Sequence, residues 1–403
     1  MFPNKILAML FTSVEYLSSY TVAGNEGPAV LLVHGFGAFL EHYRDNVDSI
    51  VNSRNRVWTI TVLGFGKSEK PNIVYTELLW SEMLRDFMIE VVGEPAHCVG
   101  NSIGGYFVSL MAFLWPDLVK SVILVNSAGN VIPGYSPLPI SKERRVPFGA
   151  QLGARLLILF LRFNVKKLLK DCYPVKPERA DEFLITEMLR ASQDPGVVMV
   201  LESIFGFDLS RPLNYLLKGF EEKTLVIQGM KDPISDPRKK VALLKEFCPG
   251  MVIKKVNAGH CPHDEIPEEV NHIICEWIAK VDNNEQQALK SLIPKPERAD
   301  EFLITEMLRA SQDPGVVMVL ESIFGFDLSR PLNYLLKGFE EKTLVIQGMK
   351  DPISDPRKKV ALLKEFCPGM VIKKVNAGHC PHDEIPEEVN HIICEWIAKV
   401  DSQ

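Results

Sequence analysis

The pentapeptide GNSIG, Gly100–Gly104, has the form GxSxG, which can present a serine as a nucleophile. A stretch typical of a buried strand, Ala96–Ser102, runs into this motif, and a stretch with helical spacing, Ile103–Trp115, follows it. A sharp turn between strand and helix would expose the Ser102 hydroxyl above the sheet, because glycines let the two backbones approach. A serine hydroxyl is a weak nucleophile near neutral pH, so the motif requires a base to take its proton.

A carboxylate that could orient such a base lies in QGMKDPISDP, Gln228–Pro237, just past the predicted strand Lys223–Gly229. A carboxylate at the C-terminal end of a strand can reach a histidine and hold its tautomer. We predict that Asp232 has this role. Asp236 directly precedes Pro237, a position more typical of a helix N-cap.

The predicted base is His260, in AGHCPH, directly after the predicted strand Met251–Asn257. A lone histidine is usually structural, but here serine, aspartate and histidine follow one another in a chain order known for catalytic triads. His263 starts the next segment, and we interpret it as a structural or pocket-lining residue.

The sequence HGFGAF, His34–Phe39, follows another apolar run and predicts a site for a developing negative charge on oxygen. Small residues in this loop would let the backbone amide of Phe36 point at that oxygen, together with the amide of Ile103 after the serine. One such donor lowers a reaction barrier by about 3 kcal/mol. The alternative is an ordinary turn from strand to loop.

Two other motifs resemble ligand sites without meeting their requirements. GFGKS at Gly64–Ser68 contains the GKS of a phosphate-binding loop, but Thr61 stands where the first glycine is required. HCPH, His260–His263, has no second histidine and cysteine cluster at a suitable spacing, so we predict no metal site. The predicted chemistry needs no organic cofactor.

Strand and helix patterns alternate along the chain, which predicts an α/β protein with a mainly parallel sheet covered by helices on both faces. Between about residues 130 and 219 this alternation stops, and helical stretches rich in leucine and phenylalanine replace it. We interpret them as an inserted helical cap, the alternative being extra scaffold helices. The predicted strands are Tyr16–Gly24, Ala29–Gly35, Arg56–Gly64, Ala96–Ser102, Lys120–Gly129, Lys223–Gly229 and Met251–Asn257.

The C-terminal third of the chain is a repeat. Residues 176–282 return letter for letter as residues 295–401. Solenoid repeats are shorter and diverged, so an undiverged copy of this length is typical of a recent exon duplication or a gene-model error. The predicted domains are an α/β domain over 1–282, a linker over 283–294, and an incomplete half-domain over 295–403.

The second copy offers Asp351 and His379 as alternatives to Asp232 and His260, but it contains no GxSxG motif. Docking it against the serine would force the whole first copy out as a loop, at a cost of a few kcal/mol. We therefore expect the first copy to complete the domain.

The balance of 45 basic and 51 acidic residues gives a net charge of −6, and no basic run indicates a nucleic-acid partner. The eight cysteines form no CxxC pair, which favours a reducing compartment without disulfides. The apolar runs are too short to span a bilayer, and the run near the N-terminus is short for a signal peptide. We therefore expect a soluble intracellular protein.

Taken together, the motifs resemble those of the α/β-hydrolase superfamily over roughly Tyr16–Ile278. HGFG, LGFGKSEKP, GNSIGG and GMKDP look closest to its epoxide-hydrolase and dehalogenase-like branch. GNSIGG and AGHCPHDEIPEEVN are similar to motifs of pheophytinase-type plant hydrolases, and the chain looks like the hydrolase region of plant photolyase-like proteins. The resemblance implies the α/β-hydrolase fold, a plant origin and a chloroplast setting, although the chain shows no transit peptide.

Two positions depart from that branch. Epoxide hydrolases and dehalogenases attack with an aspartate at the position of Ser102, so those activities are disfavoured and acyl transfer to water is implied. Thr61 stands where the branch often has an aspartate near its glycine-rich loop, so the local hydrogen bonds are expected to differ.

The leading hypothesis is a serine hydrolase that cleaves a small hydrophobic carboxylic ester through an acyl-enzyme intermediate. Ser102 attacks, His260 relays the proton, Asp232 orients His260, and the cap closes an apolar pocket over the substrate. One alternative is a C–C bond hydrolase of the same fold. The other is a non-catalytic protein that keeps the fold and pocket to bind a ligand.

Overall fold

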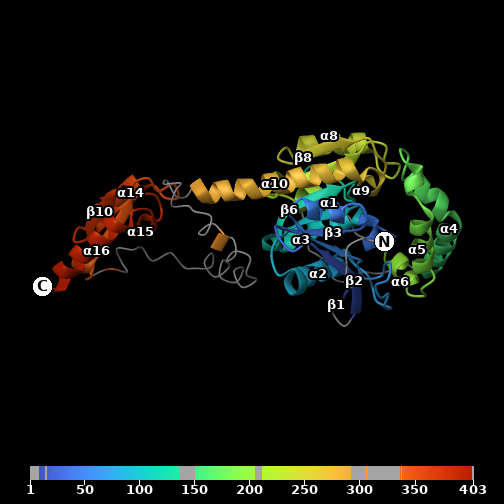
Figure 1. Ribbon diagram of the computed structural model, residues 1–403, viewed down its shortest axis with the longest axis horizontal. Helices are drawn as coiled ribbons and strands as arrows, with labels where there is room; N and C mark the ends of the chain where they lie inside the picture. The colour runs from blue at the N-terminus through green and yellow to red at the C-terminus, as the bar shows by residue number, and fades with distance from the viewer. Residues whose placement is uncertain are drawn as a thin grey trace. The chain divides into compact units, whose positions relative to one another are not determined.

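The chain forms two compact units, Met1–Val281 and Asp282–Gln403, and each is described by itself. Figure 1 shows both units along the chain. The computed structural model describes residues 9–13, 16–135, 150–204, 211–291, 305–306, 336 and 338–401.

The first unit is built on an eight-stranded sheet with the order β1-β2-β4-β3-β5-β6-β7-β8. β1 and β2 pair antiparallel with their neighbours, and every other pairing is parallel. The strands are β1 (Met9–Ser13), β2 (Tyr16–Ala23), β3 (Ala29–Val33), β4 (Arg56–Ile60), β5 (Ala96–Asn101), β6 (Val119–Val125), β7 (Thr224–Gly229) and β8 (Val252–Val256).

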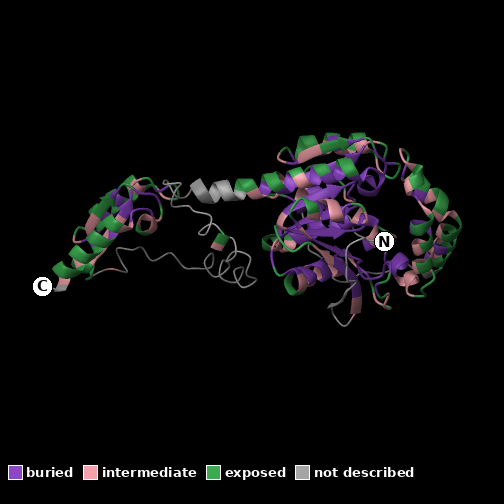
Figure 2. Ribbon diagram, in the orientation of Figure 1, coloured by how far each residue is buried: buried purple, intermediate pink, exposed green. Residues whose placement is uncertain are grey.

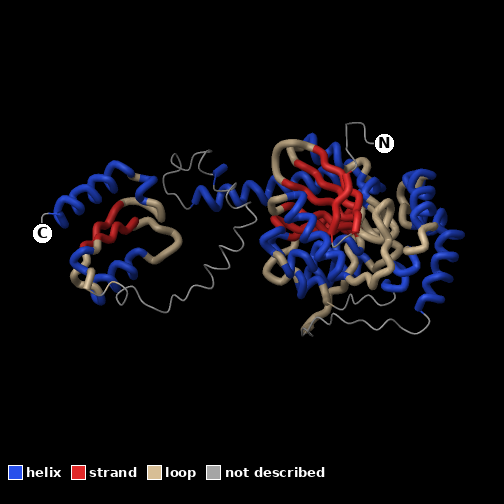
Figure 3. Tube along the Cα trace, turned by 90° about the horizontal axis from the view of Figure 1, so that it is seen from below, coloured by secondary structure: helices blue, strands red, loops and turns tan. Residues whose placement is uncertain are grey.

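Helices cover both faces of this sheet, as Figure 3 shows. Alternation along β3 explains why: Leu31 belongs to a core shared with α2 and α3, whereas Val30 and Leu32 belong to a core shared with α1 and α10. The helices are α1 (Val47–Asn52), α2 (Glu77–Phe87), α3 (Ile103–Leu114), α4 (Ala150–Asp171), α5 (Glu182–Ser192), α6 (Val197–Ile204), α7 (Leu213–Leu216), α8 (Pro237–Phe247), α9 (Pro262–Glu265) and α10 (Pro267–Ser291).

These elements confirm the predicted α/β class, the mainly parallel sheet and the helices on both faces. Each predicted strand is present, most of them ending a few residues earlier than expected. β1 was not predicted, since its sequence MLFTS belongs to an apolar run considered only as a targeting segment. Asp236 caps α8 through its side chain, which accepts from the amides of Arg238 and Lys239, as its place before Pro237 indicated.

The inserted region contributes α4 to α7, and its described residues contain no strand. α4 packs against α5 and α6, and Ala154, Ile158 and Leu201 form a small apolar core between α4 and α6. Residues 136–149 and 205–210 of the predicted cap lie outside the described residues.

The second unit contains β9 (Leu344–Gly348) and β10 (Val371–Val375), which pair parallel as a two-stranded sheet. Its described helices of four or more residues are α14 (Pro356–Phe366), α15 (Pro381–Glu384) and α16 (Pro386–Asp401). Most of the segment predicted as a linker is helical, because α10 continues to Ser291. The sequence EQQALK is rich in good helix formers, which explains the extension.

Candidate active site

Ser102 sits at a sharp corner between β5 and α3, with φ +53° and ψ −121°. A positive φ is strained for a residue with a side chain. The strained turn is possible because the backbone packs so closely at Gly100 and Gly104 that only glycine fits at these two positions. A Cβ at Gly100 would lie 2.4 Å from the amide nitrogen of Gly105, and a Cβ at Gly104 would lie 2.5 Å from the His34 carbonyl. The predicted GxSxG turn is therefore present as a strand–turn–helix corner.

His260 and Asp232 meet beside this corner. Nδ1 of His260 lies 3.0 Å from Oδ1 of Asp232, and the two residues are 9% and 6% exposed. An ionised carboxylate can only accept, so in the neutral ring Nδ1 is the nitrogen that carries the proton and Nε2 is the one with a lone pair. That is the tautomer a general base requires.

Asp232 is held in its ionised form. Burial by itself opposes ionisation, but hydrogen bonds from His260, the Ser235 hydroxyl (2.7 Å) and the Ile234 amide (2.9 Å) outweigh it. The pKa of Asp232 is therefore lowered below its ordinary value.

Asn126, at the end of β6, joins the carboxylate to the histidine loop. Its side-chain nitrogen donates to Oδ2 of Asp232 (3.1 Å) and to the carbonyl of Gly259 (2.8 Å). Its side-chain oxygen accepts from the amide of Gly229 (2.6 Å), and its φ is +43°. Sequence reasoning missed this residue, although an asparagine directly after a buried strand was a usable signal.

The segment after α4, residues 172–176, which we call the strap, holds the histidine loop from the cap side. The amide of His260 donates to the Cys172 carbonyl (2.9 Å). The buried carboxylate of Glu265 accepts from the amides of Val175 (2.6 Å), Lys176 (3.0 Å) and Gly259 (2.5 Å). The position of the imidazole therefore depends on a segment inside the cap, between α4 and α5.

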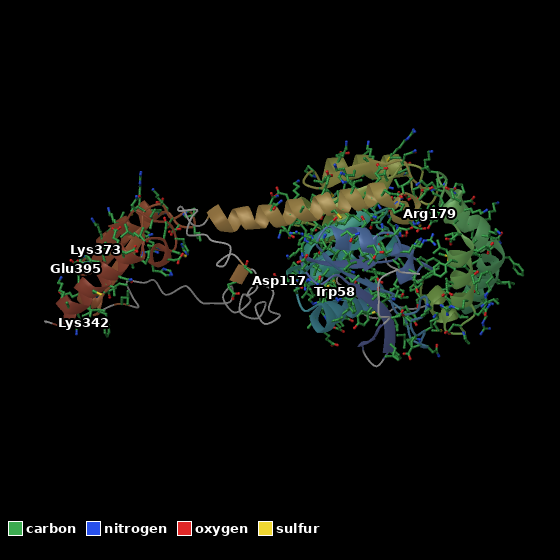
Figure 4. All side chains as sticks on the ribbon, viewed as in Figure 1. Trp58, Asp117, Arg179, Lys342, Lys373 and Glu395 are labelled. Carbon is green, nitrogen blue, oxygen red and sulfur yellow. The ribbon has the colours of Figure 1, made fainter. Side chains whose placement is uncertain are left out.

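A buried polar network also ties the cap to the core. The Tyr173 hydroxyl lies 2.7 Å from Nε2 of His42 and donates to Asp264 (2.9 Å). Asp264 pairs with Arg44 (3.1 Å) and with Arg179 (2.7 Å), the latter labelled in Figure 4. Burial lowers the pKa of His42 to about 4, so the ring is neutral at pH 7.

Ser102 and His260 line one cavity of about 620 Å³. Within the described residues no hydrogen bond joins the Ser102 hydroxyl to the imidazole, and such bonds are often long before a substrate binds. The cavity wall is mostly apolar and comes largely from the cap, including Ile158, Leu161, Val165, Leu168, Leu169, Met188, Leu189, Val197, Val200 and Leu201.

The loop after β3 turns at Phe36 and Gly37, with the amide of Ala38 donating to the Gly35 carbonyl (3.3 Å). Gly37 has φ +72°, which makes this a tight turn of the kind that requires glycine. Phe36 lines the cavity, and Ile103 is the first residue of α3, where a helix leaves its amides without partners. Phe36 thus lies in the wall of the cavity that Ser102 also lines, and Ile103 directly follows Ser102 in the chain.

The remaining predicted residues have structural settings. His263 is fully buried, with its ring against His42 and Tyr43 at centroid distances of 4.7 and 4.6 Å. The Thr61 hydroxyl accepts from the amide of Leu40 (3.0 Å), so the residue that departs from the family pattern fixes the start of a short helical turn.

Of the predicted nucleophile, base and carboxylate, the second copy repeats only the base and the carboxylate. Nδ1 of His379 lies 3.1 Å from Oδ1 of Asp351, but the histidine side chain is 47% exposed. The structure places β7 and β8 of the first copy in the sheet, beside β6.

A family model described as the alpha/beta hydrolase fold matches residues 28–267. The chain belongs to this family. The α/β-hydrolase is 26% identical over 338 residues to chloroplastic pheophytinase of Arabidopsis thaliana, covering 72% of this chain and 69% of that protein. It is 28% identical over 259 residues to lipase 1 of Psychrobacter immobilis, covering 62% and 77%. The predicted resemblance to the superfamily and to pheophytinase is confirmed.

Among solved structures, the α/β-hydrolase is similar to a meta-cleavage product hydrolase from Pseudomonas fluorescens. The TM-score is 0.52 at 22% identity, and the match covers 68% of this chain and 97% of that one. This likeness concerns the fold alone. Within the described residues, no helix is long and apolar enough to cross a membrane.

Proposed function

We propose that this α/β-hydrolase cleaves a hydrophobic carboxylic ester through an acyl-enzyme intermediate. One observation carries the proposal: a strained serine and a histidine oriented by a buried carboxylate share the wall of one apolar cavity. In the proposed roles Ser102 is the nucleophile, His260 the base and Asp232 the group that orients it. The similarity to a lipase and to pheophytinase supports a hydrolase.

In the first half-reaction, Nε2 of His260 takes the proton of the Ser102 hydroxyl as Oγ attacks the ester carbonyl carbon. The carbonyl oxygen becomes an oxyanion, and the amides of Phe36 and Ile103 donate to it. The tetrahedral species collapses, the bond to the alcohol oxygen breaks, and Nε2 gives its proton to that oxygen. The alcohol leaves, and the acyl group stays on Ser102.

In the second half-reaction, water attacks the acyl carbon while Nε2 of His260 takes one of its protons. Collapse breaks the bond to Oγ, and the proton returns to Ser102, so one water is consumed and an acid is released. Asp232 keeps Nδ1 protonated throughout and stabilises the imidazolium that forms in each half-reaction.

A fluorophosphonate probe tests the nucleophile. We expect the protein to be labelled at Ser102 and the Ser102→Ala variant to be unlabelled, with p-nitrophenyl esters hydrolysed only by the unmodified protein. Absence of labelling in folded protein would favour the ligand-binding alternative. Faster turnover of a dienone acid than of any ester would favour the C–C hydrolase alternative.

We further propose that residues 1–282 contain every residue that the reaction requires and that residues 283–403 are dispensable. Every group assigned a role above lies in the first unit. Deleting residues 283–403 should leave kcat/KM unchanged and increase the soluble yield, and loss of activity would contradict the proposal.

The chloroplast designation of the Arabidopsis relative supports a plastid location for this protein. A fluorescent fusion of the natural gene product should coincide with chlorophyll autofluorescence. A signal spread through the cytosol would contradict the proposal.

A further inference from the structure

Helix α4 of the cap has two apolar faces, of which one is covered. The inner face lines the active-site cavity through residues such as Ile158, Leu161 and Val165. The outer face carries five exposed apolar side chains, Leu152 (63%), Leu156 (60%), Leu159 (51%), Phe160 (54%) and Phe163 (81%).

The spacing of these five residues places them in one row. Steps of four, three, one and three residues keep side chains on the same side of a helix, at 3.6 residues per turn. Single exposed apolar residues are ordinary, whereas a contiguous row of this kind marks an interaction surface. In Figures 1 and 2, α4 lies at the edge of the first unit and is coloured largely as exposed. We call these five residues the α4 stripe.

The charges on α4 are opposite in sign to those of the protein as a whole. The chain has a net charge of −6, but α4 contains five basic residues and one acidic residue, Asp171. Arg162 is hydrogen-bonded to Ser192, and Lys166 pairs with Glu182 at 3.0 Å. The other three, Arg155, Lys167 and Lys170, are exposed and have no ion pair recorded within the described part of the chain.

We propose that α4 docks on an anionic lipid surface. A helix of 22 residues with an apolar row and flanking basic residues matches the pattern of helices that lie in the interface of a bilayer. The α4 stripe would enter the acyl boundary, and the basic side chains would bind the headgroups. Protein partners with an apolar groove would also cover the stripe, but they give no reason for five basic residues on one helix.

The docked orientation places the lipid on the outer side of the helix whose inner side lines the cavity. An apolar ester dissolved in the lipid would therefore lie one helix away from Ser102. The docking itself does not rest on the proposed reaction, because it is measured as binding.

Flotation of the full chain with vesicles tests the proposal. We expect binding to vesicles of equal parts phosphatidylcholine and phosphatidylglycerol, and weaker binding to phosphatidylcholine alone. The double variant Leu156→Ser, Phe163→Ser should bind the anionic vesicles at least about tenfold more weakly, because two apolar side chains no longer enter the lipid. The double variant Lys167→Gln, Lys170→Gln should lose about fivefold for each charge removed.

A matched control uses exposed apolar residues elsewhere in the chain. Leu362 and Phe366 on α14 are 45% and 56% exposed, and Leu362→Ser, Phe366→Ser should bind as the unmodified chain does. None of the changed residues lines the cavity, and circular dichroism together with thermal unfolding checks that each variant is folded.

Three results would overturn the proposal. One is no binding of the unmodified chain to anionic vesicles, and another is equal binding by the Leu156→Ser, Phe163→Ser variant. The third is a self-associating chain in ultracentrifugation that this variant turns into a monomer without change in vesicle binding, which would assign the α4 stripe to a second copy of the protein.

Discussion

Residues 176–282 and 295–401 are one sequence in two surroundings, and from residue 338 on, where the structure describes the second copy, the two fold locally in the same way. α14 has the bounds of α8 shifted by the spacing between the two copies, and α15 has those of α9 shifted in the same way. Asp355 caps α14 as Asp236 caps α8. The histidine and carboxylate meet in both copies, at 3.0 Å and 3.1 Å.

The copies differ in burial, which Figure 2 shows by colour. β7 is buried along its whole length between β6 and β8, whereas β9 has β10 as its one strand neighbour among the residues that the structure describes. Ile278 on α10 is 2% exposed, and its equivalent Ile397 on α16 is 52% exposed. The local sequence thus produces the helices, the strands and the histidine–carboxylate pair in both copies. The first copy is buried because its strands join the sheet beside β6 and its histidine loop is bonded to the strap.

The largest expected effect separates the two histidines. His260→Ala should reduce kcat/KM for an ester by about 10⁴-fold or more, because no base remains beside Ser102. His379→Ala should leave it unchanged, since that side chain is 47% exposed and the second copy has no GxSxG serine. Steady-state kinetics on p-nitrophenyl esters measures both. Loss of activity in the second variant alone would assign the reaction to the second copy.

The same substitution at equivalent positions of the two copies should change the free energy of unfolding by different amounts. Ile278→Ala should lower the free energy of unfolding of the first unit by about 2–5 kcal/mol, since it leaves a cavity in the core. Ile397→Ala should cost less than about 1 kcal/mol in the second unit, where the side chain is half-exposed. Hydrogen exchange of peptides from β3 and β5, which have no duplicate, reports on the first unit, and a peptide that ends at Gln403, which is also unique, reports on the second. An equal loss of protection in the two units, each measured in its own variant, would contradict the difference in burial.

Acid should destabilise the first unit through buried histidines. Burial lowers the pKa of His42 to about 4 from an ordinary 6.5, so between these values the unfolded chain binds a proton that the folded one does not. The stability is therefore present above pH 6.5 and is lost as the pH falls towards 4. The free energy of unfolding should fall by about 2 kcal/mol less between pH 7 and pH 5 in His42→Gln than in the unmodified chain.

Urea unfolding at the two pH values, followed by exchange of the same β3 and β5 peptides, measures this slope. His382→Gln is the control, because His382 is exposed in the second unit and its twin His263 is buried in the first. An unchanged slope in His42→Gln would show that the ring charges without cost.

The smallest effect on stability is expected at positions that are exposed to solvent in both copies. His272–Glu276 on α10 and His391–Glu395 on α16 are exposed pairs four residues apart, at 3.2 Å and 3.1 Å. Glu276→Gln and Glu395→Gln should each change the free energy of unfolding by less than about 0.5 kcal/mol. Thermal unfolding scans of the two variants should overlay, and a clear difference would mean that the helices are not in equivalent surroundings.

Much of the fold and of the candidate site could be predicted because its signals are local. A GxSxG motif between a strand and a helix, and polar residues just past apolar strands, are visible in short windows of sequence. Asp232 and His260 were found by this reasoning. Their roles and those of the amides of Phe36 and Ile103 stay predictions until Ser102 is tested.

The remaining features depend on contacts between distant residues. Asn126 contacts Asp232 and Gly259 across more than one strand, and the Cys172 carbonyl, like every backbone acceptor, has no sequence signal of its own. The strap and the polar network of Tyr173 exist only once the cap is folded. The residues of the two copies are identical, so either copy's strand could pair with β6. The residues alone therefore do not reveal which copy is buried.

The repeat begins at Lys176, just behind Cys172 and Tyr173, so all of the strap except Lys176 is missing from the second copy. A gene can in this way inherit a second histidine and carboxylate without inheriting a second activity. On the proposal that residues 283–403 are dispensable, the second copy is free of selection for catalysis, and its substitutions should accumulate first at positions whose twins are buried.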